Sequence, residues 1–277
     1  VFAVVMLVGF VPYVQANAHY RLSHPGISPS MLEAYRWIKA HTPKCPDLWN
    51  PTGAPPYRIM AAWDFGWPML DQAQRVPVSN NGGEGVMAEL EFFFRASPDE
   101  ALKILEKQNA RYVMTTPTGG KATSAFRMLG ELPDEVCLNP KIPENEKRIT
   151  ERYQATMHAG LYLRNGSGGS DGTNVWPALR NYRLLMESRE QVDTPLGSSA
   201  ACKLFDVVKG ARLQGKADAN AEVTASIELE SNAKRRFTYS DKCVADANGS
   251  FSFTLPYPSD SGTGDTKPVG KWKIISN

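Results

Sequence analysis

Residues Tyr57–Gly66 read YRIMAAWDFG, and the segments on either side of this stretch decide the fold. Its first five residues, Tyr57–Ala61, have the composition of a short buried strand, and Ala110–Thr115 (ARYVMT) is a second such run. Between the two, Ser97–Gln108 carries Pro98 in its first turn, followed by two acidic residues, which is typical of a helix start. This strand–helix–strand order predicts an α/β layer with an at least partly parallel sheet.

Trp63 and Asp64 follow the first of these strands almost directly. In α/β layers, functional residues gather beyond the carboxyl ends of the strands. A tryptophan beside an aspartate can form a shallow pocket with an indole wall, an N–H donor and an anionic acceptor, which suits a small hydroxyl group. The alternative is a core tryptophan next to an aspartate that caps a turn.

Two phosphate-transfer motifs are present only in part. Asp64-Phe65-Gly66 spells the magnesium-binding tripeptide of protein kinases, but the chain has no glycine-rich loop, strand lysine or HRD loop upstream. Thr118–Lys121 resembles the end of a P-loop, yet Thr115 replaces the first glycine and Ala122 stands where a Ser or Thr must hold the metal. Phosphate transfer is therefore excluded.

Composition excludes further classes of function. The formal net charge is +2, and no basic block is interleaved with aromatic residues, so a nucleic-acid partner is not expected. The four histidines are scattered without metal-ligand spacing, which indicates structural roles. The four cysteines also lack zinc-type spacing. Disulfides are expected only outside the cytoplasm; Cys202 with Cys243 is then the favoured pair, and free thiols remain equally open.

The chain divides into three parts by its local composition and its pattern of predicted elements. Val1–Val14 (VFAVVMLVGFVPYV) carries no charge and, at roughly 21 Å as a helix, is shorter than the ~30 Å core of a bilayer. We therefore expect residues 1–18 to be the end of a truncated transmembrane helix, with a buried core helix as the alternative. Residues 19–198 are expected to form the mixed α/β layer domain. Residues 199–277, with short β-favouring runs that begin at Lys203–Val208, are expected to form a small all-β sandwich.

The expected elements of the α/β domain continue beyond the first two strands. Ser28-Pro29 predicts the start of an amphipathic helix that ends before Thr42-Pro43. Glu84–Arg95 is expected to be a further element, Tyr182–Glu187 (YRLLME) a third strand, and Glu144–Leu163 a helical stretch that turns into a strand.

Ala62–Gly66 (AWDFG) resembles the WWDYG signature of oligosaccharyltransferase catalytic subunits, which attach a lipid-linked glycan to asparagine in Asn-X-Ser/Thr. The surrounding segments resemble the prokaryotic members and occur in that family's order. The resemblance covers most of residues 1–200, and more weakly 200–277. The segments that carry it are WIKAHTP (37–43), PYRIMAAWDFG (56–66), VSNNGGEG (78–85), EALKILEKQNARYVMTT (100–116), MHAGLYLRNGSG (157–168) and ALRNYRLLMES (178–188).

The resemblance implies a substrate-binding role for the motif. Trp63 and Asp64 match the residues that bind the Ser or Thr at position +2 of the acceptor. Phe65 keeps the ring of the family's tyrosine, and Gly66 matches its glycine. Ala62 replaces the first tryptophan, so one wall of the pocket is missing; Trp67 is a hypothetical substitute. For the family's second acceptor contact, a helix with a Met/Ile or Asp/Lys motif, the candidate is Met157, with a core role as its alternative.

The resemblance also implies what the chain lacks. In this family, acidic residues of the transmembrane half bind a divalent metal (Mn²⁺ or Mg²⁺) and activate the acceptor amide, so no catalytic or metal-binding residue is expected in this fragment. The implied partners are an acceptor polypeptide, a lipid-linked oligosaccharide and the membrane, with the soluble part on the extracytoplasmic face. The competing hypothesis is a non-catalytic, membrane-anchored glycan-binding or adhesion module.

Overall fold

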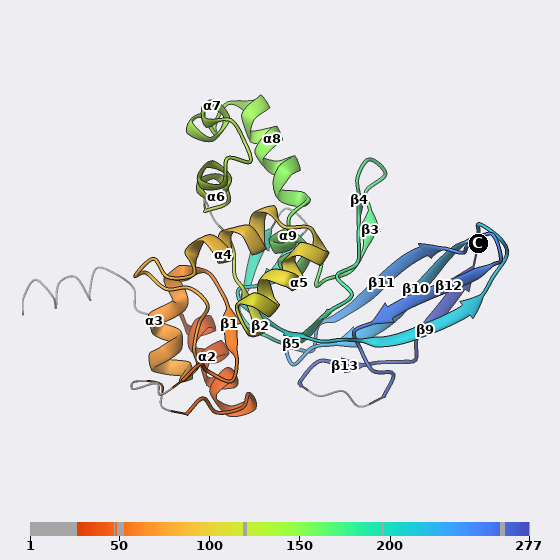
Figure 1. The fold of residues 1–277 in the computed structure, drawn as a ribbon, viewed down its shortest axis with the longest axis horizontal. Helices are drawn as coiled ribbons and strands as arrows, with labels where there is room; N and C mark the ends of the chain where they lie inside the picture. The colour runs from red at the N-terminus through yellow and green to blue at the C-terminus, as the bar shows by residue number, and fades with distance from the viewer. Residues whose placement is uncertain are drawn as a thin grey trace, which may run out of the picture.

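The computed structural model describes residues 27–46, 48, 53–118, 121–194, 197–260 and 264–276. Figure 1 shows a mixed α/β part, which extends to β8 (Lys203–Val207), and an elongated all-β part, which begins at β9 (Ala211–Lys216). The expected transmembrane segment, residues 1–18, lies outside the described residues. No helix within them is long and apolar enough to cross a membrane.

A four-stranded sheet forms the centre of the α/β part. Its order is β1 (Arg58–Met60), β2 (Ala110–Thr115), β8 (Lys203–Val207) and β5 (Tyr182–Glu187). β1 and β2 pair in parallel, whereas β8 pairs antiparallel with both of its neighbours. The expected α/β layer with a partly parallel sheet is therefore confirmed.

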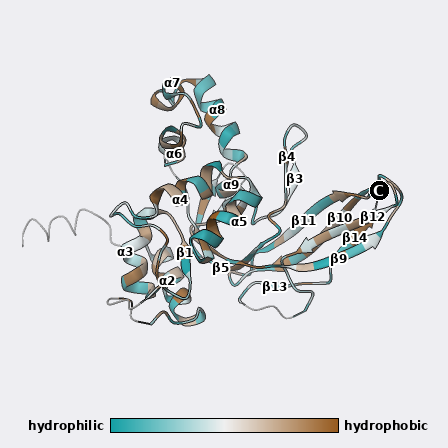
Figure 2. Ribbon diagram, in the orientation of Figure 1, coloured by the Kyte–Doolittle hydropathy of each residue, from teal (hydrophilic) through white to brown (hydrophobic). Residues whose placement is uncertain are grey.

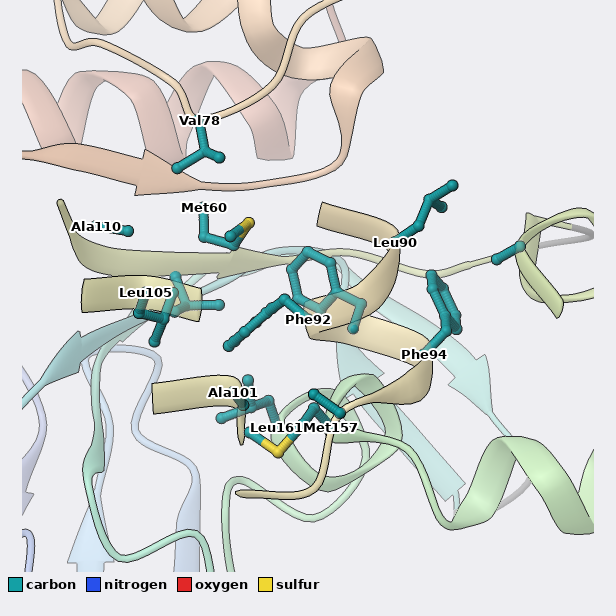
Figure 3. Close-up of a cluster of buried hydrophobic side chains, with 14 of the residues drawn as sticks. Met60, Val78, Leu90, Phe92, Phe94, Ala101, Leu105, Ala110, Met157 and Leu161 are labelled. Atoms are coloured by element: carbon teal, nitrogen blue, oxygen red, sulfur yellow. The ribbon is translucent and has the colours of Figure 1, made fainter. Parts of the chain in front are cut away.

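Helical segments cover both faces of this sheet. Successive side chains of each strand point to opposite faces, and here both faces carry apolar residues that the helices bury. On β2, Val113 packs into the cluster with Phe92 and Leu105, while Tyr112 and Met114 pack into the cluster on the other face. Figure 3 shows the first cluster. The helical segments are α2 (Pro29–His41), η1 (Trp63–Phe65), α3 (Gly66–Pro68), η2 (Met69–Ala73), α4 (Val86–Leu90), η3 (Glu91–Arg95), α5 (Pro98–Lys107), α6 (Lys121–Leu129), α7 (Asp134–Leu138), α8 (Pro143–Gln154) and α9 (Met157–Tyr162).

The predicted helix starts are confirmed. α2 begins at Pro29 behind Ser28, whose hydroxyl accepts a hydrogen bond from the Met31 amide. α5 begins with a capping box: the Ser97 hydroxyl accepts from the Glu100 amide, and the Glu100 carboxylate accepts from the Ser97 amide. α5 is the last helix of the long crossover that makes the parallel pairing of β1 and β2 possible.

One strand prediction was wrong. We expected Lys203–Val208 in the sandwich, but β8 lies in the middle of the α/β sheet. Leu204 packs on one face of that sheet and Phe205 on the other, so the strand is buried on both sides. A short β-favouring run does not reveal which sheet it joins. The expected boundary at residue 199 thus cuts off a sheet strand, and we propose a boundary near Gly210 instead.

The expected strand at the end of Glu144–Leu163 was also wrong. This stretch forms two helices, α8 and α9, and no strand among the residues described there. α8 buries none of its residues and is mainly hydrophilic in Figure 2. Every residue of α9 is buried. A short helix that is buried all round has no amphipathic period, and its apolar run resembles a strand.

The all-β part consists of two packed sheets, as the prediction of a small sandwich requires. The central strand β10 of the larger sheet buries Val223 and Ala225 against Phe253 and Leu255 of the smaller sheet. The larger sheet contains β10 (Glu222–Glu230), β11 (Arg236–Val244), β13 (Lys267–Pro268) and β14 (Lys273–Ser276), and the smaller one β9 (Ala211–Lys216) and β12 (Ser250–Leu255). Two short hairpins complete the fold: β3 (Gly169–Ser170) with β4 (Val175–Trp176), and β6 (Gln191–Thr194) with β7 (Gly197–Ala200).

The favoured disulfide is not formed. All four cysteines lie among the described residues and are free thiols. Cys202 is buried in the core cluster beneath α2, whereas Cys243 packs in the all-β part. Nearness in sequence suggested the pair, but the two residues belong to different packing units.

A buried polar cluster joins the sheet to the all-β part. Glu187 of β5 has no exposed surface and accepts hydrogen bonds from Arg235 (2.5 and 2.9 Å) and from the Ser231 hydroxyl (2.5 Å). The Lys203 ammonium donates to the Tyr162 carbonyl oxygen (2.6 Å). Burial, together with the charge of Arg235, lowers the pKa of Lys203 to about 7, although Glu187 acts in the opposite direction.

We predict that Glu187→Gln lowers the free energy of unfolding by about 3 kcal/mol, because it leaves Arg235 without its carboxylate partner. The matched control is Glu228→Gln, which removes an exposed carboxylate 3.8 Å from Arg236 and is expected to change stability by less than about 0.5 kcal/mol. Urea unfolding of the three proteins measures both effects. Equal losses in the two variants would contradict a supporting role for the buried cluster.

Candidate functional site

The Trp63–Phe65 turn lies at the carboxyl end of β1, beside the carboxyl end of β2. It is a single 3₁₀ turn that leads into α3. Trp63 is 39% exposed, and the side chain of Asp64 is 37% exposed. Both side chains are therefore open to solvent at the edge of the sheet, where the sequence predicted a binding site.

Two glycines fix the local backbone around this turn. A Cβ atom on Gly66 would lie 2.4 Å from the Ser79 carbonyl oxygen, so only glycine lets the turn pack against this segment. Gly85 has a φ of +71°, and a Cβ there would lie 2.0 Å from the Val78 carbonyl oxygen. Gly85 precedes α4, so this close contact sets the start of the helix that carries Glu89.

A pocket of about 170 Å³ opens beside the turn. Its inner surface is mainly apolar and comes from η3, the end of β2 and α6, whereas Trp63, Asp64 and Lys121 supply polar groups. It therefore combines an apolar surface with a few polar groups, as small-ligand sites do. The lining residues are Ala62, Trp63, Asp64, Val86, Glu89, Leu90, Phe93, Phe94, Met114, Thr115, Thr116, Pro117, Thr118, Lys121, Ser124, Ala125, Met128 and His158.

Asp64 forms an ion pair with Lys121, the first residue of α6. The Lys121 ammonium also lies 5.4 Å from the centre of the Phe65 ring. The pair uses Oδ2 of Asp64, and no other donor to this carboxylate is recorded in the described part of the chain. Oδ1 is therefore available to accept a hydrogen bond from a ligand hydroxyl.

Glu89 of α4 lies beneath the same turn and is only 2% exposed. Its Oε2 accepts a hydrogen bond from the Trp63 amide (3.2 Å). Burial raises the pKa of the Glu89 carboxyl to about 7; the Asp64 charge acts in the same direction, whereas the Trp63 amide and Lys121 oppose it. Glu89 therefore changes its charge near neutral pH.

His158 of α9 closes the inner end of the pocket. Its Nε2 lies 3.1 Å from the Thr116 carbonyl oxygen and its Nδ1 lies 2.9 Å from the Tyr153 hydroxyl. Because a carbonyl oxygen can only accept, Nε2 carries the proton and Nδ1 accepts from Tyr153. Burial lowers the pKa of His158 to about 3, so the ring is neutral and its role is structural.

The expected site residues fall into two groups. Ala62, Trp63 and Asp64 line the pocket, while Phe65 and Gly66 shape the turn behind it. Met157 does not line this pocket: it is 3% exposed and lies beside Ala101 and Leu161 in the core cluster (Figure 3).

Trp67 does not replace the missing wall. It is 52% exposed and lines a separate groove with Pro55, Pro56 and Leu70. The hypothesis that Trp67 substitutes for the first tryptophan of the motif was therefore wrong. At Ala62, the wall of the pocket is therefore only a methyl group.

The sequence analysis missed most of the lining residues, and four of these carry ionisable or adaptable side chains. Lys121 could have been found, because it follows β2 just as Asp64 follows β1, and the same rule for strand ends applies to both. Met128 lies two helical turns further along α6. Glu89 and His158 carry no local sequence signal, because their positions depend on how α4 and α9 pack around the strand ends.

No metal centre is present in the described part of the chain. Nowhere in it do three or more His, Cys, Asp or Glu side chains come together in a way that could hold a metal ion. The carboxylates of the pocket, Asp64 and Glu89, have Lys121 as their neighbour instead.

Two family profiles match the chain, and together they cover more than half of it. The first is described as the AglB core domain and matches residues 30–118, which include the Trp63–Phe65 turn. The second is described as the archaeal glycosylation protein B long peripheral domain and matches residues 210–277. This second match covers the all-β part from β9 onward.

Similar curated proteins are archaeal glycotransferases. Dolichyl-phosphooligosaccharide-protein glycotransferase 3 of Archaeoglobus fulgidus is 25% identical over 300 residues, which cover 79% of this chain and 34% of that protein. Glycotransferase 2 of the same organism is 35% identical over 137 residues, covering 49% of this chain and 23% of that protein. The chain thus spans about a third, or less, of the length of these relatives.

Solved structures show the same fold. The Archaeoglobus fulgidus oligosaccharyltransferase in complex with Zn and sulfate matches with a TM-score of 0.70 and 19% identity, over 91% of this chain and 44% of that one. AglB of the same organism, in complex with an inhibitory peptide and a dolichol-phosphate, matches with a TM-score of 0.70 and 19% identity, over 91% and 40%. At this identity the likeness establishes the fold alone.

We predict that Glu89→Gln makes stability less dependent on pH. The raised pKa of Glu89 means that the folded state holds its proton better than the unfolded state does. Its stabilising contribution is complete below the ordinary value of 4.5 and is lost as the pH rises through about 7. Relative to Glu89→Gln, the free energy of unfolding of the wild type should therefore fall by up to about 3 kcal/mol between pH 4.5 and pH 8.

Urea unfolding at several pH values measures this difference. His158 titrates in both proteins, so its contribution cancels in the comparison. The control is Glu91→Gln, whose half-exposed carboxylate lies 3.6 Å from Arg95; its stability should run parallel to that of the wild type. If the free energy of unfolding of Glu89→Gln also changed with pH in parallel with that of the wild type, this would contradict the raised pKa of Glu89.

Proposed function

We propose that this chain, which belongs to the AglB family of archaeal oligosaccharyltransferases, is the C-terminal region of such an enzyme. In this proposal, the region recognises the acceptor sequence Asn-X-Ser/Thr. The observation that carries the proposal is the solvent-open pair of Trp63 and Asp64 beside a small, mainly apolar pocket. In the full-length enzyme this region would hold the acceptor polypeptide while a lipid-linked oligosaccharide is transferred to its asparagine.

In the proposed complex, the hydroxyl group of the Ser or Thr at position +2 donates a hydrogen bond to the Asp64 carboxylate. A hydrogen bond to a charged acceptor contributes about 1.5–3 kcal/mol. Lys121 holds the other carboxylate oxygen, so the acceptor atom is oriented before the ligand arrives. The indole of Trp63 covers the bound side chain from the solvent side.

The second acceptor contact is proposed to come from α6 rather than from Met157. Lys121 and Met128 both belong to α6 and both line the pocket, whereas Met157 is buried in the core cluster. Met128 is 54% exposed and adaptable, which suits contact with the methyl group of threonine. α6 holds one member of each implied pair, a lysine and a methionine, but neither the Asp nor the Ile partner.

The remaining properties of the full-length enzyme are also proposals for this chain. Solved relatives carry an inhibitory peptide with a dolichol-phosphate, or are tethered to an acceptor peptide containing the NVT sequon. We propose the corresponding partners here, with the soluble region on the extracytoplasmic face of a membrane. A relative that holds Zn suggests a divalent metal in the family, but the described residues offer no ligand cluster, and the proposed role of this chain contains no metal-dependent step.

The test is the binding of short peptides to the protein. A peptide with Asn-Ala-Thr should bind about tenfold to a hundredfold more tightly than one with Asn-Ala-Ala, because the second lacks the hydroxyl group. Asp64→Asn should remove most of this preference. Isothermal titration calorimetry or fluorescence anisotropy measures the affinities.

Two exposed tryptophans provide a matched control. Trp63→Ala should weaken binding of the threonine peptide, whereas Trp67→Ala should leave it unchanged, because Trp67 lines a different groove. Equal binding of the two peptides to the wild type would remove the recognition role.

A further inference from the structure

Glu89 has an unusual position in the pocket. It is almost completely buried, yet it forms no ion pair in the part of the chain that the structure describes. Its one recorded hydrogen bond comes from the main-chain amide of Trp63, through Oε2. Oε1 has no recorded partner among the described residues, and the side chain lines the pocket. Oε1 is not among the fully buried polar atoms that lack a partner, so it is open to the pocket. The carboxyl group as a whole is nevertheless largely withdrawn from solvent, which disfavours its charged form.

Three ionisable side chains face Glu89 from the elements packed around it. Asp64 faces it from the turn, Lys121 from α6 and His158 from α9. His158 is neutral because of its burial. The charges that act on Glu89 are therefore those of Asp64 and Lys121, which are themselves an ion pair. The Lys121 ammonium thus attracts both carboxyl groups, Asp64 through an ion pair and Glu89 through its charge.

We propose that Glu89 is a positioning residue of the acceptor pocket, which holds the Trp63–Asp64 turn through the Trp63 amide and competes with Asp64 for Lys121. This inference rests on the proposed function of the pocket and deepens it. The charge on Glu89 sets how strongly the Asp64 carboxylate attracts the acceptor hydroxyl, so Glu89 controls affinity without touching the acceptor.

The direction of the effect follows from electrostatics. When Glu89 is protonated, the Lys121 charge is directed at Asp64 alone, and Asp64 is a weaker acceptor for a further donor. When Glu89 releases its proton to solvent, Lys121 is shared between two carboxylates and the pocket gains negative charge, so a hydroxyl donor binds more tightly. Because burial brings the pKa of Glu89 to about 7, both states are populated at neutral pH.

The first experiment measures the affinity of the Asn-Ala-Thr peptide between pH 5 and pH 9. For the wild type, affinity should increase on the order of fivefold as the pH rises, the upper range for contacts between partly exposed charges. Glu89→Gln keeps an oxygen for the Trp63 amide but has no charge, so its affinity should stay at the low-pH value throughout. Glu91→Gln should follow the wild type.

A residue that only supports the fold would not change the shape of this pH profile. Parallel profiles for the wild type and Glu89→Gln would therefore overturn the inference while leaving the proposed function intact. If the peptide fails to bind at every pH, the proposed function is wrong, and the second experiment still decides the coupling.

The second experiment needs no peptide. Carboxyl carbon NMR follows the titration of Glu89 in the free protein. The midpoint should fall in Asp64→Asn, which removes a repelling charge, and rise in Lys121→Met, which removes an attracting one. An unchanged midpoint in both variants would show that the three groups are not coupled, and would overturn the inference independently of acceptor binding.

Discussion

The parallel pairing of β1 with β2 is the constraint on which the rest of the site depends. With Ile59 opposite Tyr112 and Met60 opposite Val113, both strands end at the same edge of the sheet. The turn after β1 then presents Trp63 and Asp64, while the segment after β2 leads to Lys121 at the start of α6. An antiparallel pair would separate these side chains by the length of a strand. The Asp64–Lys121 ion pair is therefore a consequence of topology, which the helical crossover from β1 to β2, ending in α5, makes possible.

Two buried carboxyl groups of the molecule, Glu187 and Glu89, differ in how completely they are paired. At the junction with the all-β part, Glu187 is enclosed by Arg235 and Ser231, so its charge is neutralised by short hydrogen bonds. In the pocket, Glu89 has only a main-chain amide and a lysine that it shares with Asp64. A fully paired buried carboxylate supports the fold, whereas a partly paired one keeps a proton equilibrium near neutral pH. Stability would be better served by an apolar residue at position 89, and this favours a functional reason for the glutamate.

The sequence predicted those features that depend on local patterns, and missed those that depend on packing. Ala110–Thr115 and Tyr182–Glu187 were predicted with the bounds of β2 and β5, because each is a buried run of six residues between clear breaks. The caps at Ser28 and Ser97 predicted α2 and α5 for the same reason. β8 was assigned to the wrong sheet, and α9 was mistaken for the approach to a strand, because a run that is buried on all sides has no periodicity to read. In the site, the AWDFG turn was recognisable, but Glu89 and His158 enter the pocket only through the packing of α4 and α9.

The substitution at Ala62 has a structural consequence that follows from this arrangement. The family motif has a tryptophan at this position, and here a methyl group lines the pocket instead. Trp67 does not compensate, since it lines another groove. With one aromatic wall removed, the pocket depends more heavily on the groups that remain, namely the indole of Trp63, the side chain of Met128 and the charges at Asp64, Lys121 and Glu89. Hydrophobic contact tolerates small differences in a ligand, whereas a site built around hydrogen bonds to a hydroxyl group rejects ligands that lack it. The selectivity that we propose for a hydroxyl-bearing residue therefore does not depend on the missing apolar surface.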